Sequence, residues 1–367
     1  MSKKLSPVAP EADLQRSPAR ATIDDVARVA AVSKATVSRF LNDRSDLLTA
    51  DISARVAAAI RALAYRPSPA AQGLKRGRSR LVGLVVADIT NPYSVAVLRG
   101  AEQAFRAAGY MVLLFNAGND GEREREAIAA LADYQVEGFI VHAPSGAAAA
   151  LDAAARRGRP VVLVDRRPDG EATPFDLVGL DNRGAVRLGV AHLLDAGYRQ
   201  LLYITEPSSG VSSRQERVTA FEAEVATQPG AKGASIESSA DGDPLALDAA
   251  LCQLQRQARG RPCAVFSGNA VVTLRVAAAA ARIGASFGSE LGLLGFDDTD
   301  WAPLIGPGIS TISQPTDDIG RCAATCLLER MQGATLSARQ VLLPGTLIAR
   351  NSTCITYVEK RKVAESR

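Results

Sequence analysis

Polar side chains that could bind a small molecule follow the apolar segments in the body of the chain. They are carboxylates, amides, arginines, a tyrosine and the single tryptophan: Asn91, Tyr93, Asp165, Arg166, Arg217, Asn269, Asp297, Trp301 and Gln314. Recognition of a polyhydroxyl compound needs such a set, because carboxylates and amides bond to hydroxyl groups and an aromatic face covers the C–H side of a sugar ring. Taken alone, each Asn or Asp is about as often a helix cap as a binding group.

The elements that would position these side chains alternate along the chain. Apolar segments at 81–87, 111–115, 138–142, 161–165, 201–205, 263–267 and 291–295 predict strands, and helix-like stretches at 94–108, 121–134, 147–157, 182–196, 212–227, 244–258 and 269–283 lie between them. Such alternation indicates parallel sheets covered on both faces. We therefore predict an α/β fold with two doubly wound parallel-sheet subdomains. Ligands bind beyond the carboxyl ends of such strands, so the polar set should meet in a cleft between the halves.

An enzyme is a weaker interpretation of the same residues. Where a glycine-rich dinucleotide motif would follow the first strand, the chain has the sequence DITNP at 88–92. Serine hydrolase chemistry would have to use His142, at the end of a strand, or His192, within a helix, and we expect both to be structural. We predict no enzymatic activity, no catalytic residue and no cofactor.

Cysteine usage and hydropathy indicate a cytoplasmic protein. The five cysteines are odd in number and widely spread, which fits a reducing compartment and no disulfide framework. Cys322 and Cys326 lie one helical turn apart, but no histidine is near them, so we expect small buried side chains and no metal site. There is no apolar run of about 18 residues, and no apolar stretch follows Lys3 and Lys4, so neither a membrane span nor an export signal is expected.

Charge is distributed unevenly along the chain. Residues 1–80 carry 15 basic and 7 acidic side chains, a net charge of +8, whereas the remainder carries a net charge of −4. A basic segment joined to a slightly acidic body favours contact with phosphate, the alternative being ordinary solvated arginines.

Three short helical patterns occupy residues 22–64 of this basic segment. Thr22, Ser33 and Thr49 can cap them, and only the segment 31–33 separates the first helix from the second. Two helices joined so tightly, with a third closing the core, predict a small all-α helix-turn-helix domain. The second helix, 34–41, exposes Lys34 and Arg39, and such a recognition helix reads base edges in the major groove. The alternative is a three-helix bundle that binds protein.

A basic segment with one large aliphatic residue follows this domain. Pro67 ends the third helix, and a short, weak helix around Gly73 is expected next. Leu74 stands there beside Lys75 and Arg76. An apolar side chain flanked by cations is what a minor-groove wedge requires, because it opens a base step while the cations hold the phosphates.

Three segments resemble the lactose/galactose repressor family in order and spacing. They are ATIDDVARVAAVSKATVSRFLN, the run ending ALAYRPSPAAQGLKRGRS, and the LVGLVVADITNPY that follows it. The resemblance extends through nearly the whole chain after residue 20. It implies a helix-turn-helix head, a hinge helix and a core like that of periplasmic sugar-binding proteins, acting as a homodimer on operator DNA. One departure is Ala31, where the turn usually has glycine. If the position needs a positive φ, alanine strains it by about 1 kcal/mol.

The resemblance and the residue patterns together set the expected domains and DNA contacts. We expect a disordered tail at 1–20, the helix-turn-helix domain at 21–66, the hinge at 67–79 and an effector-binding and dimerisation domain at 80–358. Within the last, the N-subdomain should comprise 80–178 and 315–342, and the C-subdomain 179–312 and 343–358. The expected DNA-binding residues are Thr22, Ser33, Lys34, Ala35, Thr36, Ser38, Arg39, Asn42, Leu74 and Lys75.

Effector contacts also follow from the resemblance. Positions at which the family contacts sugar-type effectors match Asp165, Arg217, Asn269, Asp297 and Gln314. Arg217 is the leading candidate, because a guanidinium can donate to two ligand oxygens at once. Further arginines nearby favour an acidic sugar, and the segment GFDDTDWAPLIGPGISTISQPTDDIG is similar to that of gluconate and ketogluconate repressors in the family. The alternatives are a neutral sugar or a purine as effector, or a solute-binding receptor without a regulatory role.

Overall fold

The chain folds into two compact units, Met1–Ser79 and Arg80–Arg367, each with its own core. The computed structural model describes residues 21–42, 47–66, 78–142, 148–168, 173–288 and 291–355. Leu74 and Lys75, with most of the expected hinge, lie outside the described residues. The first unit is called the head below, and the second the body.

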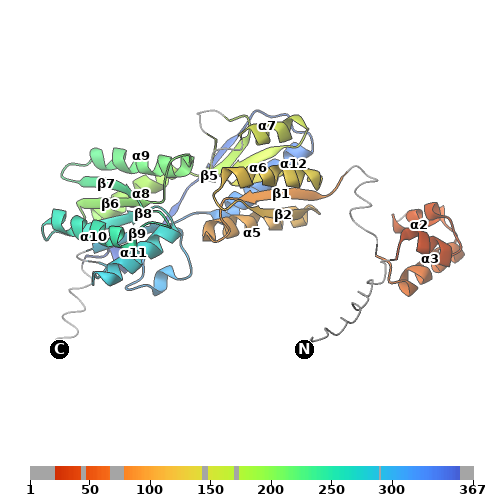
Figure 1. Cartoon of the computed structure of the whole chain (residues 1–367), viewed down its shortest axis with the longest axis horizontal. Coiled ribbons are helices and arrows are strands. Elements are labelled where there is room, and N and C mark those ends of the chain that lie inside the picture. The colour runs from red at the N-terminus through yellow and green to blue at the C-terminus, as the bar shows by residue number, and fades with distance from the viewer. Residues whose placement is uncertain are drawn as a thin grey trace, which may run out of the picture. The chain divides into compact units, whose positions relative to one another are not determined.

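The described residues of the head form three helices, α1 (Ile23–Val29), α2 (Lys34–Leu41) and α3 (Ala50–Ala62), drawn in red to orange in Figure 1. Each begins where the sequence offers a hydroxyl cap: the side chains of Thr22, Ser33 and Thr49 accept hydrogen bonds from backbone N–H groups in the first turn. The core is made by Val26, Val37 and Val56 with neighbouring alanines. The predicted helix-turn-helix domain is confirmed.

The turn between α1 and α2 is strained at one residue and supported by another. Ala31 has a φ of 52°, in the left-handed region that disfavours a Cβ. The side chain of Arg55, from α3, donates hydrogen bonds to the carbonyl oxygens of Ala30 and Ala31, each with a distance of 2.9 Å from Nη2. Arg55 thereby satisfies carbonyls that the end of α1 leaves without helical partners.

The body consists of two parallel-sheet subdomains (Figure 1). The elements around the first sheet are β1 (Leu81–Val86), α5 (Pro92–Ala107), β2 (Met111–Asn116), α6 (Gly121–Asp133), β3 (Phe139–His142), α7 (Ala148–Arg156), β4 (Val161–Val164), β5 (Asp176–Leu180), α12 (Thr316–Met331) and β11 (Gln340–Leu343). Those around the second are α8 (Asn182–Asp195), β6 (Gln200–Thr205), α9 (Ser212–Ala226), β7 (Lys232–Glu237), α10 (Pro244–Ala258), β8 (Cys263–Ser267), α11 (Ala270–Arg282), β9 (Leu291–Phe296), β10 (Ser310–Ser313) and β12 (Thr346–Ile348), with short 3₁₀ turns at Ala302–Leu304 and Asn351–Thr353.

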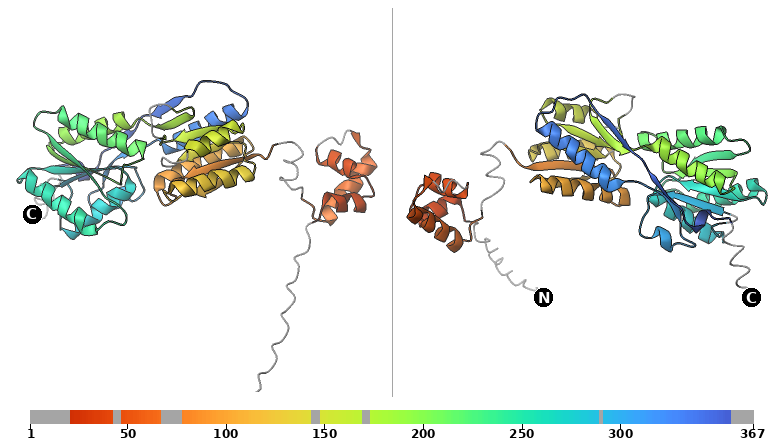
Figure 2. Two further views of the ribbon diagram at one scale, coloured as in Figure 1. Left: turned by 45° about the horizontal axis from the view of Figure 1, so that its top comes forward. Right: turned by 180° about the vertical axis from the view of Figure 1, so that it is seen from behind.

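The two sheets have equivalent strand orders within the described residues and differ in the direction of one edge strand. Their strand orders are β11-β5-β4-β3-β1-β2 and β12-β10-β9-β8-β6-β7, and only the β10–β12 pair is antiparallel. The chain passes between the subdomains after β5, after β10 and after β11, and Figure 2 shows the dark blue C-terminal strands continuing from one into the other. The predicted α/β fold class is confirmed.

Helices α5 and α12 come into close contact on one face of the first sheet. A Cβ on Gly100 would lie 2.2 Å from the carbonyl oxygen of Asp317, and one on Gly320 would lie 2.1 Å from that of Val97. Each helix therefore has a glycine where the other's backbone approaches, which lets α12 join a subdomain whose other helices come from the first half of the chain.

Five strands were not among the sequence predictions: β5, β7, β10, β11 and β12. Strand β7 is an exposed edge strand of sequence KGASIE, and β12 has only three residues, so neither has the apolar run that reveals a buried strand. Among the described residues, no helix has both the length and the apolar character needed to cross a bilayer.

Replacement of Ala31 by glycine should stabilise the head, because it removes a Cβ from a left-handed position. The expected gain is roughly 1 kcal/mol in the free energy of opening, measured by amide hydrogen exchange of α1 and α2 in the full chain. Ala30→Gly is the matched control, since Ala30 is right-handed with a φ of −76° and should lose stability. If both variants changed the free energy of opening in the same direction, the turn at Ala31 would not be strained.

Candidate functional site

Two aspartates occupy equivalent positions in the two sheets. Asp165 follows β4 and Asp297 follows β9, each the third strand of its sheet. Both have a positive φ, 62° and 69°, and each donates its backbone N–H to the neighbouring strand, with N···O distances of 2.9 Å to Val178 and Ile312. Left-handed, non-glycine residues at strand ends are typical of functional sites. The repeat therefore brings one carboxylate from each subdomain to the cleft.

Asp165 is surrounded by donors from both subdomains. Its side chain is 8% exposed, and Oδ2 accepts a 2.9 Å hydrogen bond from Ser213 Oγ, at the start of α9. His142 Nε2 and Arg166 Nε lie 3.5 and 3.7 Å from the same oxygen, and Arg217 Nη2 lies 3.9 Å from Oδ1. Burial opposes ionisation, but the imidazole and the two guanidinium groups outweigh it, so the pKa of Asp165 lies well below its usual value. Asp165 is a buried carboxylate that keeps its charge.

Arg217 is held in a fixed position by the C-subdomain and by Gln314 near its border. Its Nε donates to Asn182 Oδ1 at 2.8 Å, its Nη1 to the Gly268 carbonyl at 2.8 Å and its Nη2 to Gln314 Oε1 at 3.3 Å. The guanidinium carbon lies 4.2 Å from the centre of the Phe296 ring. All three nitrogens are thus engaged by the protein, and the planar group is oriented by stacking.

Asp297 and Gln314 form the second polar pair of the cleft. Gln314 Nε2 donates to Asp297 Oδ1 at 2.7 Å, and the backbone N–H of Ala270 donates to Oδ2 at 3.1 Å. Burial raises the pKa of Asp297, against the opposing effect of Arg217. This carboxyl group is therefore the more readily protonated of the two equivalent aspartates.

Arg166 differs from Arg217 in having few partners. It is 6% exposed, its Nη1 lies 3.5 Å from Asn119 Oδ1, and its Nε makes no hydrogen bond within the described residues. Burial lowers the pKa of Arg166, with Asp165 as the main opposing charge. Two further buried atoms, Tyr93 Oη and Asp165 Oδ1, also lack hydrogen bonds to described residues. Buried polar atoms without partners are rare, so this wall of the cleft is suited to a polar ligand.

A cavity of about 400 Å³ adjoins Tyr93, whereas Asp165, Arg166 and Arg217 are not among its lining residues. Tyr93, Asp297, Trp301 and Gln314 line it, together with residues around Pro92 and Thr316. Its size falls within the range of roughly 300–1,000 Å³ that is typical of small-molecule sites. Burial keeps the pKa of Tyr93 well above its usual value, so its phenol remains a donor.

Two expected effector residues are helix caps. Asn91 Oδ1 accepts from the backbone of Tyr93 at the start of α5, and Asn269 Oδ1 accepts from Val272 at the start of α11. The Asn269 amide also donates to Glu206 Oε2 at 2.7 Å. Both lie at carboxyl ends of strands, as expected, but their side chains already have protein partners.

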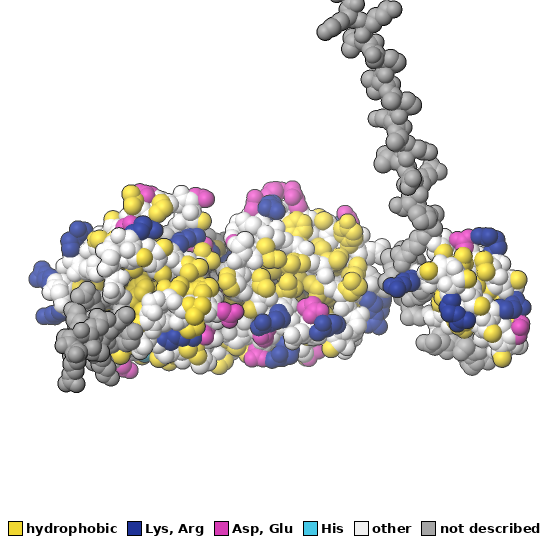
Figure 3. Space-filling model, turned by 90° about the horizontal axis from the view of Figure 1, so that it is seen from below, with side chains coloured by type: hydrophobic (Ala, Val, Ile, Leu, Met, Phe, Trp, Pro, Cys, Tyr) yellow, Lys and Arg dark blue, Asp and Glu magenta, His cyan; other side chains and the backbone are white. Residues whose placement is uncertain are grey.

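In the head, the expected DNA-binding residues lie around α2. Lys34, Ala35 and Arg39 are exposed, whereas Thr36 and Ser38 are half-buried. Lys34 Nζ lies 2.8 Å from Asp24 Oδ2, an exposed ion pair of small energetic value. Thr22 and Ser33 are exposed caps, and Asn42 donates through Nδ2 to the Ser38 carbonyl at 2.6 Å. Figure 3 shows Lys and Arg side chains spread over the visible surface of the head, with few acidic ones between them.

Comparison with known proteins assigns this architecture. A sequence profile described as "Bacterial regulatory proteins, lacI family" matches residues 22–68, and one described as "Periplasmic binding protein-like domain" matches residues 190–353. The HTH-type transcriptional regulator PtxS of Pseudomonas plecoglossicida is 44% identical over 93% of this chain and 98% of its own length. The chain belongs to the lacI family. This lacI-family protein is a DNA-binding transcription regulator, as the sequence predicted.

Other relatives agree. The HTH-type transcriptional regulator KdgR of Bacillus subtilis is 37% identical over 90% of the regulator and 97% of its own length. A crystal structure of the lac repressor dimer bound to operator and the anti-inducer ONPF superimposes with a TM-score of 0.77 and 26% identity, covering 91% of the regulator and 99% of that chain.

Sequence reasoning missed several residues of the cleft in this lacI-family protein. His142 was expected to be structural, yet its ring lies beside Asp165 and 5.2 Å from that of Tyr93, and burial lowers the pKa of His142 so that the imidazole stays neutral. Its position at the carboxyl end of β3 is the signal that could have found it. Asn182 and Ser213 begin helices and looked like ordinary first-turn residues. His192, in contrast, bonds to Thr353 at 2.7 Å, away from the cleft.

Glu124, on α6 near Arg166, should make the stability of the body depend on pH. It is 1% exposed, and burial raises the pKa of Glu124 to about 8. Above the ordinary pKa of a glutamate, the unfolded chain releases a proton that the folded protein still binds at Glu124. The stability that Glu124 contributes is therefore fully present below about pH 4.5 and is lost as the pH rises towards 8.

Glu124→Gln should therefore raise the free energy of unfolding by on the order of 2 kcal/mol at about pH 8 and by much less at about pH 5. Urea denaturation at the two pH values measures the difference. Glu122→Gln, on the exposed side of the same helix, is the control and should show little pH-dependent gain. A similar response from both variants would show that burial of Glu124 does not set the pH dependence.

Proposed function

We propose that this regulator binds operator DNA as a homodimer in the cytoplasm, and that a sugar acid held between the two subdomains changes its affinity for the operator. The observation that carries the effector assignment is Arg166, a buried guanidinium whose Nε lies 3.7 Å from Asp165 Oδ2 but has no hydrogen-bond partner in the described residues. Identity above a third with two transcription regulators supports the DNA-binding role.

The DNA-binding proposal rests on the exposed N-terminal part of α2. Lys34 and Ala35 stand in its first turn, where a recognition helix contacts base edges, and Arg39 is exposed in its last turn. The only acidic side chain that contacts Lys34 in the described residues is Asp24, and both groups are more than half exposed. Such a pair opens at little cost, so Lys34 is available to a guanine edge.

An apolar surface supports the dimer. Ile89, Val95, Met111 and Leu114, around α5 and β2, are between 37% and 65% exposed. Figure 3 shows a broad apolar area on the visible face of this subdomain. Contiguous apolar patches on a folded domain favour association with another protein surface, and the lac repressor to which the regulator is similar is a dimer on its operator.

An acidic ligand best provides partners for the polar groups on the N-subdomain side of the cleft. Arg217 is already bound by three protein oxygens, so it contributes orientation and its remaining N–H groups. Arg166 has free donor capacity, and a ligand carboxylate would give it a charge-assisted partner that a neutral hydroxyl supplies less well. The hydroxyl groups of the same ligand could bond to Asp165 Oδ1 and Tyr93 Oη, which also need partners.

Contacts across the cleft offer a route from effector to DNA. Ser213 bonds to Asp165, Ser212 Oγ accepts from the Arg167 backbone at 3.0 Å, and Arg167 forms an ion pair with Glu216. These contacts join the N-subdomain to α9. A ligand bound to Asp165 changes the relative free energy of open and closed arrangements, and only such differential binding can shift the operator affinity.

Lys34→Ala should change which operator base is preferred, with a loss of roughly 1–3 kcal/mol on the preferred sequence and little loss on its variants. Arg61→Ala, on α3, serves as a charge-matched comparison and should act weakly and alike on all sequences. Binding to a panel of operator variants at fixed salt measures both. An equal loss on every sequence for Lys34→Ala would mean that Lys34 only neutralises phosphate.

Arg166→Gln should weaken sugar-acid binding by roughly 2–3 kcal/mol, because it removes the charged donor. Calorimetry with gluconate and 2-ketogluconate measures the loss, and glucose provides the neutral comparison. Arg187→Gln is the control: this exposed guanidinium on α8 is paired with Glu224 and makes none of the contacts between the subdomains described above, so its removal should change ligand affinity far less.

Two results would count against this assignment. Tighter binding of glucose than of either acid, unaffected by Arg166→Gln, would make the effector a neutral sugar. Binding of a purine and of no sugar acid would replace the ligand class, with the DNA-binding role unchanged.

A further inference from the structure

A second concave surface lies on the C-subdomain, at the edge of its sheet opposite the cleft. Gln200 and Lys232 are the first residues of β6 and β7, and Pro262 directly precedes β8, so the pocket opens at the amino ends of these strands. Asp297 follows the carboxyl end of β9 in the same parallel sheet. The pocket, with a volume of about 940 Å³, therefore lies at the opposite end of the strands from Asp297 and shares no lining residue with the cavity beside Asp297.

The pocket is lined by charge of a single sign. Five of its lining residues are cationic, Arg199, Lys232, Arg256, Arg259 and Arg261, and none of its lining residues is acidic. Within the described residues none of the five forms an ion pair, whereas other exposed arginines of this subdomain do, such as Arg187 with Glu224 and Arg282 with Asp248. This concentration of unpaired positive charge occurs in a part of the chain, residues 81–367, whose net charge is −4.

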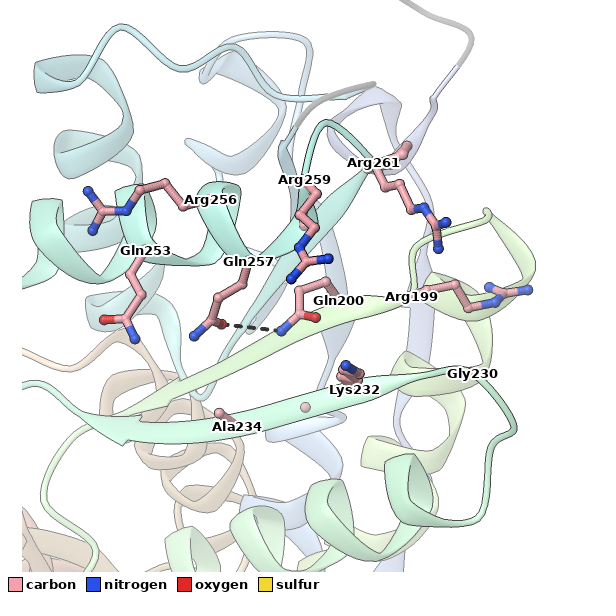
Figure 4. Close-up of a pocket in the computed structure, with 13 residues that line it drawn as sticks. Arg199, Gln200, Gly230, Lys232, Ala234, Gln253, Arg256, Gln257, Arg259 and Arg261 are labelled. Atoms are coloured by element: carbon pink, nitrogen blue, oxygen red, sulfur yellow. Dashed lines mark hydrogen bonds between the residues drawn. The ribbon is translucent and has the colours of Figure 1, made fainter.

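The side chains come from three separate segments that meet at this edge (Figure 4). Gln257 and Arg259 extend from the end of α10 and the turn after it toward β6 and β7, and Gln257 Oε1 accepts from Gln200 Nε2 at 3.4 Å. Arg259 has a left-handed backbone with a φ of 53°, a conformation that costs energy for a residue with a Cβ. Lys232 projects from the exposed edge strand β7.

We propose that this pocket binds a compact polyanion that carries two or more phosphate charges, and so gives the regulator a second small-molecule site. A concave surface lined by one sign of charge raises the local concentration of counter-ions. Guanidinium groups match phosphate oxygens through paired N–H donors, and the amide groups of Gln200, Gln253 and Gln257 add neutral donors beside them. The volume suits a small molecule, whereas duplex DNA is bound by extended basic surfaces.

Inorganic pyrophosphate is the probe for this site. Calorimetry on the full chain at constant ionic strength should show one binding event for each chain. Lys232→Gln/Arg259→Gln should weaken it by about tenfold or more, because two charge-assisted partners are lost. Arg256→Gln/Arg261→Gln provides an independent second variant with the same expected loss. Removal of clustered like charges should leave the unfolding midpoint unchanged or raised, which verifies folding.

The matched control removes the same charge elsewhere. Arg156→Gln/Arg157→Gln acts at the exposed end of α7, in the other subdomain, and should leave pyrophosphate affinity unchanged. No binding of pyrophosphate, or an equal loss in the control and in both pocket variants, would overturn the proposal. A pocket variant that weakens binding to non-specific duplex DNA but not to pyrophosphate would also overturn it, in favour of a nucleic-acid contact. Binding of gluconate to the pocket variants tests the effector site separately.

Discussion

The buried carboxylate of Asp165 organises the body of this protein. It is ionised in a site that is 8% exposed, and such a charge is tolerated only where cations and donors surround it. The required groups come from both subdomains: Arg166 follows it in the chain, while Ser213 and Arg217 lie on α9. The charge therefore joins the two halves at the point where a ligand would enter, so a ligand that alters its surroundings also alters the contact between the halves.

The repeated topology explains why the cleft has polar groups on both walls. The two sheets have equivalent strand orders, so the third strand of each ends at the cleft. Each of these strands is followed by an aspartate with a positive φ. The environments then differ: Asp165 is surrounded by cations, whereas Asp297 is held by an amide and a backbone N–H, and burial raises its pKa. One fold element used twice thus provides one firmly ionised carboxylate and one that protonates more readily.

Arginines have three different roles in this chain. Arg55 and Arg217 are structural supports whose donors are used by carbonyl and amide oxygens of the protein. Arg167 joins the subdomains through Glu216. Arg166 Nε has no hydrogen-bond partner among the described residues, and the five cations that line the pocket on the C-subdomain form no ion pair there. Residue type alone does not separate these roles, because the partners of each guanidinium come from distant parts of the sequence.

Local patterns were sufficient for the helices from α5 to α11, for seven of the strands and for the helix-turn-helix head, because caps and hydrophobic periodicity act over a few residues. They also indicated that Asp165 follows a strand and that Tyr93, Asp297 and Gln314 lie near one another, since strand ends in a parallel sheet share one edge. Tertiary structure alone decided the rest. The edge strand β7 has no apolar run, Arg55 reaches a turn 24 residues away, and the neutral, buried state of His142 depends on burial beside Asp165. Pairing, burial and protonation are set by groups that come together only in the folded chain.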